Sequence, residues 1–144
     1  MEEILFVEHN SEDYWEAVKL RYKLLRQPLG LNYSEERLAK EADDLHLVYK
    51  RERQILACLV ITLKSKDTVQ VKQIAVENSY QRQGVGKKLM EFLHNHLIQK
   101  EVKQIELAAR ETAIDFYEKL GYVQEGERFI KITLPHVKMR RSLE

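Results

Sequence analysis

A junction between an apolar segment and an amphipathic segment, within residues 68–99, constrains the fold of this chain more than any other feature. Residues 68–76 are apolar enough for a β-strand, and from Gly84 onward apolar residues recur at helical spacing. Between them stands the stretch of residues 81–89, Gln-Arg-Gln-Gly-Val-Gly-Lys-Lys-Leu. The sequence therefore predicts a strand, a glycine loop and a helix of residues 84–99 that packs on a sheet.

The glycine loop is suited to binding phosphate. The first N–H groups of a helix lack intrahelical partners, and the aligned peptide dipoles place roughly half a positive charge at the helix N-terminus. Gly84 and Gly86 have no side chain that would keep a bulky anion from the backbone, and glycine adopts positive φ where a loop requires it. We therefore expect a phosphate-bearing ligand at the start of this helix.

The strand predicted at residues 68–76 breaks the alternation that a strand normally shows. Apolar residues stand at odd positions up to Val71 and at even positions from Ile74 onward. Because alternate residues of a strand face the same side, one inserted residue near positions 72–73 would restore the pattern. The pattern predicts a β-bulge there, which leaves backbone polar groups unpaired by the neighbouring strand and available to a ligand amide.

The other segments also alternate between strand-like and helix-like patterns. The first helix is predicted after Ser11, with Trp15, Val18, Tyr22 and Leu25 on its buried face. The remaining predicted strands span residues 4–9, 45–50, 54–63, 104–109, 122–123 and 129–134, and the other two predicted helices begin near residues 34 and 113. This order, with antiparallel pairs towards the ends of the chain, implies a mixed α/β sheet with helices on both faces.

Length and composition restrict the class of protein. The chain has 44% hydrophobic and 33% charged residues, and we expect residues 1–144 to form a single domain. A formal net charge of +1 gives no general attraction to nucleic acid, and no apolar run is long enough to predict a membrane span. The first residues lack the pattern of a secretory signal, so we expect a cytoplasmic protein. No residues have metal-ligand spacing, so no metal is predicted.

Two familiar classes of glycine loop do not fit residues 81–89. The phosphate loop of nucleotide triphosphatases has Lys-Ser or Lys-Thr after its glycines, whereas Lys88 follows Lys87 here. A dinucleotide-binding loop requires glycine at the position of Leu89 and an acidic residue at a strand end about twenty positions later. Glu106 lies inside its predicted strand instead.

A third class of loop, Gln/Arg-x-x-Gly-x-Gly/Ala after a bulged strand, is matched by residues 81–86. A second motif, Ala-Ile-Asp-Phe-Tyr-Glu-Lys-Leu-Gly-Tyr at residues 113–122, follows at the expected distance. With these two motifs the chain resembles the GCN5-related N-acetyltransferases (GNAT) over residues 54–125. The resemblance implies a mostly antiparallel central sheet of six to seven strands with a bulged, splayed central strand. It also implies acyl-CoA binding and acyl transfer to an amine.

The resemblance implies where acetyl-CoA, the expected acyl donor, would bind. Backbone N–H groups of the loop would hold its pyrophosphate, and the bulged strand would pair with its pantetheine amides like an added strand. The cofactor-binding residues implied in this way are Ile74, Ala75, Val76, Gln81, Arg82, Gln83, Gly84, Val85, Gly86 and Lys87. Arg82 and Lys87 would add charge-assisted contacts, whereas Gln81 and Gln83 are expected to act mainly through their backbone.

Acyl transfer to an amine requires a neutral nucleophile and a protonated leaving thiolate. Deprotonating an alkylamine of pKa near 10.4 costs about 4 to 5 kcal/mol at pH about 7, so a base or a water relay is expected. The resemblance assigns Tyr117 as the general acid for the thiolate, although its spacing alone indicates a core aromatic residue beside Phe116. Candidates for the base are Glu77, Asp43, Asp44, His46 and His136, each of which is also explained by a structural or solvent-facing role.

Two classes of function remain open at this point. The first is an N-acetyltransferase that uses acetyl-CoA, or a donor with a longer acyl group, on a primary amine of a small molecule or peptide. The alternative is a non-catalytic acyl-CoA-binding sensor or interaction module, against which the presence of Tyr117 argues. Arg110, where many relatives carry asparagine, reaches the cofactor or an acidic acceptor, or pairs with Glu106 or Glu111. No motif indicates the acceptor, or whether the protein is a monomer or a homodimer.

Overall fold

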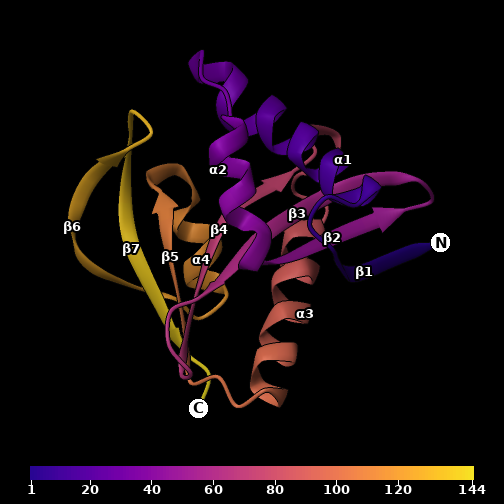
Figure 1. Cartoon of the computed structure of the whole chain (residues 1–144). Coiled ribbons are helices and arrows are strands. Elements are labelled where there is room, and N and C mark those ends of the chain that lie inside the picture. The colour runs from indigo at the N-terminus through magenta and orange to yellow at the C-terminus, as the bar shows by residue number, and fades with distance from the viewer.

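The computed structural model describes residues 1–144 and has a seven-stranded sheet at its centre (Figure 1). The strands are β1 (Glu2–Val7), β2 (Leu45–Arg51), β3 (Gln54–Leu63), β4 (Thr68–Val76), β5 (Gln104–Arg110), β6 (Val123–Lys131) and β7 (Leu134–Ser142). Their order across the sheet is β1-β2-β3-β4-β5-β7-β6. Every neighbouring pair is antiparallel except β4 and β5, which are parallel. The predicted mixed, mostly antiparallel sheet is therefore confirmed.

Helices cover both faces of the sheet, as the sequence predicts (Figure 1). They are α1 (Glu12–Arg21), α2 (Glu35–Ala39), α3 (Val85–Gln99) and α4 (Ile114–Lys119). Neighbouring residues of β3 pack into different clusters, Cys58 with Ala17 of α1 and Leu59 with Leu89 of α3. Because successive side chains of a strand point to opposite faces, α1 and α3 lie on opposite sides of the sheet. None of the helices combines the length and the apolar character that a membrane-crossing helix needs.

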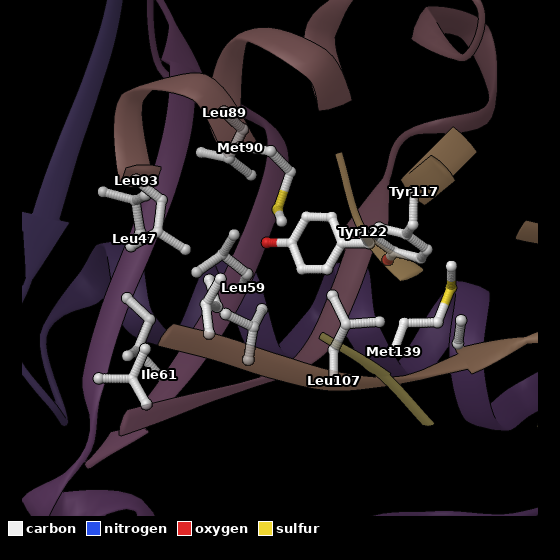
Figure 2. Close-up of a cluster of buried hydrophobic side chains, with 14 of the residues drawn as sticks. Leu47, Leu59, Ile61, Leu89, Met90, Leu93, Leu107, Tyr117, Tyr122 and Met139 are labelled. Carbon is white, nitrogen blue, oxygen red and sulfur yellow. The ribbon is translucent and has the colours of Figure 1, made fainter. Parts of the chain in front are cut away.

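The larger hydrophobic core lies between α3 and the sheet and contains 22 buried residues. Figure 2 shows its centre, where Leu47, Leu59 and Ile61 of β2 and β3 lie near Leu89, Met90 and Leu93 of α3, and Leu107, Met139, Tyr117 and Tyr122 lie to one side. These apolar contacts fix α3 and α4 against the middle of the sheet. The core therefore determines where the glycine loop and Tyr117 stand relative to β4.

The buried face of α1 differs from the predicted one. Trp15 is 41% exposed, whereas Tyr14 and Arg21 are each only 1% exposed. Both buried side chains bond to the carboxylate of Glu41. The prediction that Trp15 is buried was wrong because apolar periodicity does not detect a helix face that buries polar groups paired with one another.

The C-terminal strands also differ from the prediction. Residues 129–134, expected to form one strand, contain the turn between β6 and β7. Ile132 and Thr133 have φ angles of 52° and 65° in this turn. Two successive residues with positive φ usually include glycine or asparagine, so these β-branched residues carry no recognisable turn signal. The turn brings Lys131 and His136 close to the end of β5, where His136 pairs with Arg110.

The bulge predicted in β4 is present. Cys58 of β3 pairs with Ala75, and Val60 pairs with Lys72, so two residues of β4 stand opposite one residue of β3. One of those two residues is Gln73, whose φ of 56° lies in the left-handed region that is uncommon for residues other than glycine. The extra residue accounts for the change in apolar alternation along this strand.

The bulge also marks the place where β4 separates from β5. The two strands pair only along residues 68–71 of β4, opposite residues 104–107 of β5. β5 continues beside β7 as far as Arg110. Over residues 108–110, β5 therefore pairs with β7 on one side and has no strand partner on the other side. The central strand is therefore splayed as the resemblance implies, and one edge of β4 has no strand partner beyond Val71.

Candidate functional site

The glycine loop connects β4 to α3 and presents unpartnered backbone N–H groups. Gly84 is the N-cap residue with a φ of 81°, and no side chain caps the helix. The first intrahelical bond runs from Lys88 N to Gly84 O at 3.0 Å, so the N–H groups of residues 85–87 have no partner within the helix. The side chains of Arg82 and Lys87 are exposed beside them. This arrangement is suited to an anion such as phosphate.

The two glycines of the loop have different roles. A Cβ atom added to Gly84 would meet no atom within 4 Å, so the space in front of its backbone is open. A Cβ atom added to Gly86 would lie 3.3 Å from Phe116 Cζ and 3.4 Å from Val76 Cγ2. The missing side chain of Gly86 therefore allows α3 to approach β4 and α4 closely.

The two glutamine side chains of the loop bond within the protein. Gln81 Nε2 donates to Val76 O at 3.0 Å and to Asn78 Oδ1 at 3.1 Å. Gln83 Nε2 donates to Ser79 O at 2.8 Å. These bonds hold the loop against the end of β4. The backbone N–H groups of Gln81 and Gln83 also donate within the loop, to Asn78 O at 3.3 Å and to Tyr80 O at 3.4 Å.

The unpaired edge of β4 offers backbone groups at alternate residues. Glu77 N donates to Leu56 O at 2.8 Å, and the same register continues with Ala75 opposite Cys58. Because alternate residues of a strand direct their N–H and C=O groups to the same side, the backbone of Ala75 faces β3. The backbones of Ile74 and Val76 therefore face the splayed side, where Val76 O already accepts the bond from Gln81 Nε2. Ile74 and the N–H group of Val76 are better placed than Ala75 to bond an extended ligand.

A cavity of about 140 Å³ lies where β4 and β5 separate. Its walls are the segment after α1, the bulge of β4, the end of β5, the start of α4 and the β6–β7 turn. Ile74 and Tyr117 both line it. None of the loop residues 81–87 does, so the glycine loop and the cavity are separate parts of the candidate site.

Tyr117 is placed by α4 with its hydroxyl group available to the cavity. The side chain is 6% exposed, and its ring packs edge-on against Phe116 and Tyr122 at centroid distances of 5.0 and 5.7 Å. The hydroxyl oxygen has no hydrogen-bond partner in the protein, and protein atoms do not enclose it completely. Burial raises the pKa of Tyr117 above its ordinary value, so the phenol stays protonated at neutral pH.

Among the five candidates for a general base, only His136 lines the cavity. His136 Nδ1 lies 2.8 Å from Leu134 O. A carbonyl oxygen only accepts, so Nδ1 carries the proton and Nε2 is the free acceptor of the neutral ring. Burial lowers the pKa of His136 below its ordinary value, and the nearby charges of Lys131 and Arg110 lower this pKa further. The imidazole is therefore neutral at pH 7.

The other four candidates for the base lie outside the cavity. Glu77 pairs with Lys23 Nζ at 2.7 Å, and Asp44 accepts a bond from Thr62 Oγ1 at 2.9 Å. His46 Nε2 bonds to the backbone carbonyl of Glu41 at 2.9 Å, and Asp43 is exposed. None of these four residues lines the cavity, and only Asp44 contacts a residue that does, through Lys72 Nζ at 3.6 Å.

Arg110 forms neither of the ion pairs considered from the sequence. Glu106 pairs with Lys64 and Lys138, and Glu111 lies 3.7 Å from Arg128. Arg110 instead lines the cavity, where its Nη2 approaches Leu25 O at 3.5 Å. The alternative of an internal ion pair for Arg110 was wrong.

Three further cavity residues were not detected from the sequence: Arg26, Lys72 and Lys131. They belong to the segment after α1, to the bulge of β4 and to the end of β6. No motif connects residues that are so far apart along the chain. Of the three, only Lys72 lies where the sequence predicted a structural feature, the bulge near residues 72–73.

Comparison with known proteins identifies relatives of this chain. Residues 27–143 match the model of a family described as the acetyltransferase (GNAT) domain. A Bacillus subtilis (strain 168) protein assigned to the acetyltransferases is 31% identical over 139 residues, which cover 92% of each chain. The family match includes the glycine loop, Tyr117 and His136.

Solved structures share the fold. A Lactobacillus plantarum structure assigned as an N-acetyltransferase superposes with a TM-score of 0.88 at 19% identity, over 99% of each chain. A GNAT family acetyltransferase from Elizabethkingia anophelis, solved with acetyl-CoA bound, gives a TM-score of 0.74 at 16% identity, over 98% of this chain and 97% of that one. At these identities the likeness concerns the fold.

Proposed function

This chain belongs to the GNAT acetyltransferases, and on that premise we propose that it transfers the acetyl group of acetyl-CoA to a primary amine of a small molecule or peptide. The observation that carries the proposal is that Tyr117, whose hydroxyl has no hydrogen-bond partner in the protein, lines a cavity where the strands β4 and β5 separate. A module that only bound acyl-CoA would have no use for a proton donor at this place.

The residues present fit acetyl-CoA along an extended path. The free N–H groups of residues 85–87 and the open space at Gly84 suit its diphosphate. The backbones of Ile74 and Val76 suit the amides of its pantetheine arm. Tyr117 stands next to Ile74 in the cavity lining, which suits the thioester end. The related structure that holds acetyl-CoA supports this assignment.

Two side chains of the cavity provide the proton transfers that the reaction needs. Acetyl-CoA supplies a thioester, whose carbonyl carbon forms a bond to the amine nitrogen while its bond to sulfur breaks. His136 Nε2 accepts the proton that the amine loses, and the Tyr117 hydroxyl donates a proton to the departing sulfur. The cations around the cavity also disfavour the protonated form of the amine, which lowers the cost of generating the nucleophile.

The proposed donor site is tested by replacing Gly84 with glutamate. We expect calorimetry to give Kd values for coenzyme A and acetyl-CoA between about 1 µM and 1 mM, the usual range for enzyme substrates. Gly84→Glu places a carboxylate in the open space before the helix. Repulsion between this carboxylate and the diphosphate should raise both Kd values by about tenfold or more.

Gly126 provides a matched control for this substitution. Its φ of 82° and its open surroundings are the same as those of Gly84, but it lies in β6 away from the loop. Gly126→Glu should cost similar backbone strain and leave the Kd unchanged. The proposed donor site is refuted when wild-type protein binds no coenzyme A, or when both variants bind it equally. Binding without release of free coenzyme A from any amine would support the non-catalytic module instead.

The proposed base predicts a specific pH dependence. The pKa of His136 in the folded protein lies below 6.5, so kcat/KM should fall as the pH drops through this value and the imidazole becomes protonated. His136→Gln should remove this acid limb from the profile. His96→Gln, a substitution on α3 outside the cavity, should retain it. An unchanged acid limb in His136→Gln would show that another group is the base.

A further inference from the structure

The cavity beside Tyr117 is lined by cations and by no carboxylate. Arg26, Lys72, Arg110 and Lys131 line it together with His136, and none of the other lining residues is acidic. The four cations come from four separate elements of the fold. Because the whole chain has a formal net charge of only +1, this concentration of positive charge is local.

Arg26 is buried there without a counter-ion. Its side chain is 5% exposed, and its guanidinium stacks over the ring of Tyr33 at 4.6 Å. Its Nη1 donates to Leu25 O at 3.2 Å, and its Nη2 approaches Gln73 Oε1 at 3.5 Å. Both acceptors are neutral. A buried charge without an opposite charge is costly, so this guanidinium favours the arrival of an anion.

The neighbouring cations are also unpaired, with one exception. Arg110 and Lys131, like Arg26, take part in none of the ion pairs of the structure. Lys72 alone has a carboxylate nearby, Asp44 Oδ2 at 3.6 Å. Burial and the charges of Arg37 and Lys72 lower the pKa of Lys131, which indicates that its ammonium is poorly compensated. Arg21, the other deeply buried arginine, by contrast forms an ion pair with Glu41.

The phosphates of the donor do not account for these cations. The loop proposed to hold the diphosphate contributes no residue to the cavity. The part of acetyl-CoA proposed to reach the cavity is the end of the pantetheine arm and the thioester, which carry no charge. The anion that would satisfy Arg26 and Lys131 therefore belongs to the second substrate.

On the basis of the proposed function, we infer that the acceptor is a small amine that also carries an anionic oxygen group, a carboxylate or a phosphate. Arg26, Arg110 and Lys131 bind this group and leave the amine facing His136 and Tyr117. The cavity of about 140 Å³ also receives the thioester end of the donor, so it leaves room only for a small acceptor. Polyamines and other purely cationic amines are disfavoured by repulsion from the same residues.

Matched pairs of amines test the inference by turnover. Release of free coenzyme A from acetyl-CoA is measured with β-alanine, 4-aminobutyrate and L-glutamate, with the carboxamide of each, and with 2-aminoethyl phosphate and putrescine. We expect kcat/KM to be about 10- to 100-fold higher for the anionic member of a pair than for its neutral counterpart. The phosphate compound distinguishes a phosphate group from a carboxylate as the preferred anion.

Single substitutions identify the cations responsible. Lys131→Gln and Arg26→Gln should each lower kcat/KM for the preferred anionic amine by about tenfold and leave the neutral amides within about threefold of wild type. Lys131 is only half-buried, so its substitution remains informative if Arg26→Gln fails to fold. Lys119→Gln, on the exposed side of α4, is the control and should change neither value.

A binding measurement separates this inference from the proposed reaction. N-acetyl-β-alanine and its amide are titrated into protein saturated with coenzyme A, which requires no turnover. The anion site is supported if N-acetyl-β-alanine binds more tightly than its amide and if this difference in Kd is lost in Lys131→Gln. This result would count even when no amine is acetylated. Equal or tighter binding of the amide, or higher kcat/KM for amides or putrescine, overturns the inference and leaves the acetyltransferase proposal intact. Absence of coenzyme A binding would instead refute the donor site.

Discussion

Tyr117→Phe is expected to lower kcat for acetyl transfer by about 100-fold or more, because the variant lacks the proposed donor of a proton to the leaving thiolate. The unpartnered hydroxyl of Tyr117 lines the cavity, and its raised pKa keeps it protonated. Phenylalanine preserves the ring and its contacts with Phe116 and Tyr122. The Tm and the Kd for acetyl-CoA should therefore stay close to the wild-type values, while steady-state release of coenzyme A falls.

Tyr122→Phe is the matched control for this experiment. Tyr122 lies next to Tyr117 in the same core (Figure 2), but its hydroxyl bonds to His94 Nε2 at 2.7 Å and does not line the cavity. Removal of the Tyr122 hydroxyl should lower the free energy of unfolding by about 1 kcal/mol, because the hydrogen bond with His94 is lost. It should leave kcat nearly unchanged. Wild-type kcat in Tyr117→Phe, or equal losses in the two variants, would eliminate Tyr117 as the general acid.

Glu41→Gln is expected to destabilise the protein by about 3 to 5 kcal/mol, because it leaves a buried arginine without its counter-ion. Arg21 Nη1 and Nη2 donate to the two carboxylate oxygens of Glu41 at 2.9 and 2.7 Å. Tyr14 Oη donates to the same carboxylate at 2.9 Å. The Arg21 side chain is 1% exposed, so water does not replace the lost partner. A loss of this size is a large fraction of the about 5 to 15 kcal/mol that stabilises a typical domain.

Urea unfolding of three variants tests this expectation. Glu16→Gln removes one partner of the exposed pair with Lys19, whose Nζ lies 3.2 Å from Glu16 Oε1, and should cost at most about 1 kcal/mol. Arg21→Met combined with Glu41→Met should recover much of the stability lost in Glu41→Gln, since no buried charge remains. If Glu41→Gln were as stable as Glu16→Gln, the buried pair would not contribute to the fold as argued.

The features predicted correctly from the sequence are local along the chain. The β4 bulge followed from the change of apolar alternation between Val71 and Ile74, because strand geometry fixes which residues share a face. The start of α3 followed from Gly84 and the apolar stripe after it. The position of Tyr117 on a short helix, which ends at Lys119 just before Gly121, came from one continuous motif. Each of these signals lies within about ten residues.

The features that were missed depend on contacts between distant segments or on unusual backbone. The inward face of α1 was misassigned because Arg21 is buried only by virtue of Glu41, twenty residues later. The β6–β7 turn was missed because Ile132 and Thr133 adopt positive φ without the residues that usually announce it. Gly86 proved to serve packing against Phe116, a contact that no local pattern indicates.

The sequence by itself determined the α/β class, the bulged strand and the glycine loop before α3, because periodicity and glycine placement act through the backbone of adjacent residues. Only the tertiary structure decided that Arg26, Arg110, Lys131 and His136 surround one cavity beside Tyr117. These residues belong to elements that approach one another through the sheet order and the splay of β4 from β5. Electrostatic interactions act through space, so the charge of this cavity is set by which segments the fold brings together.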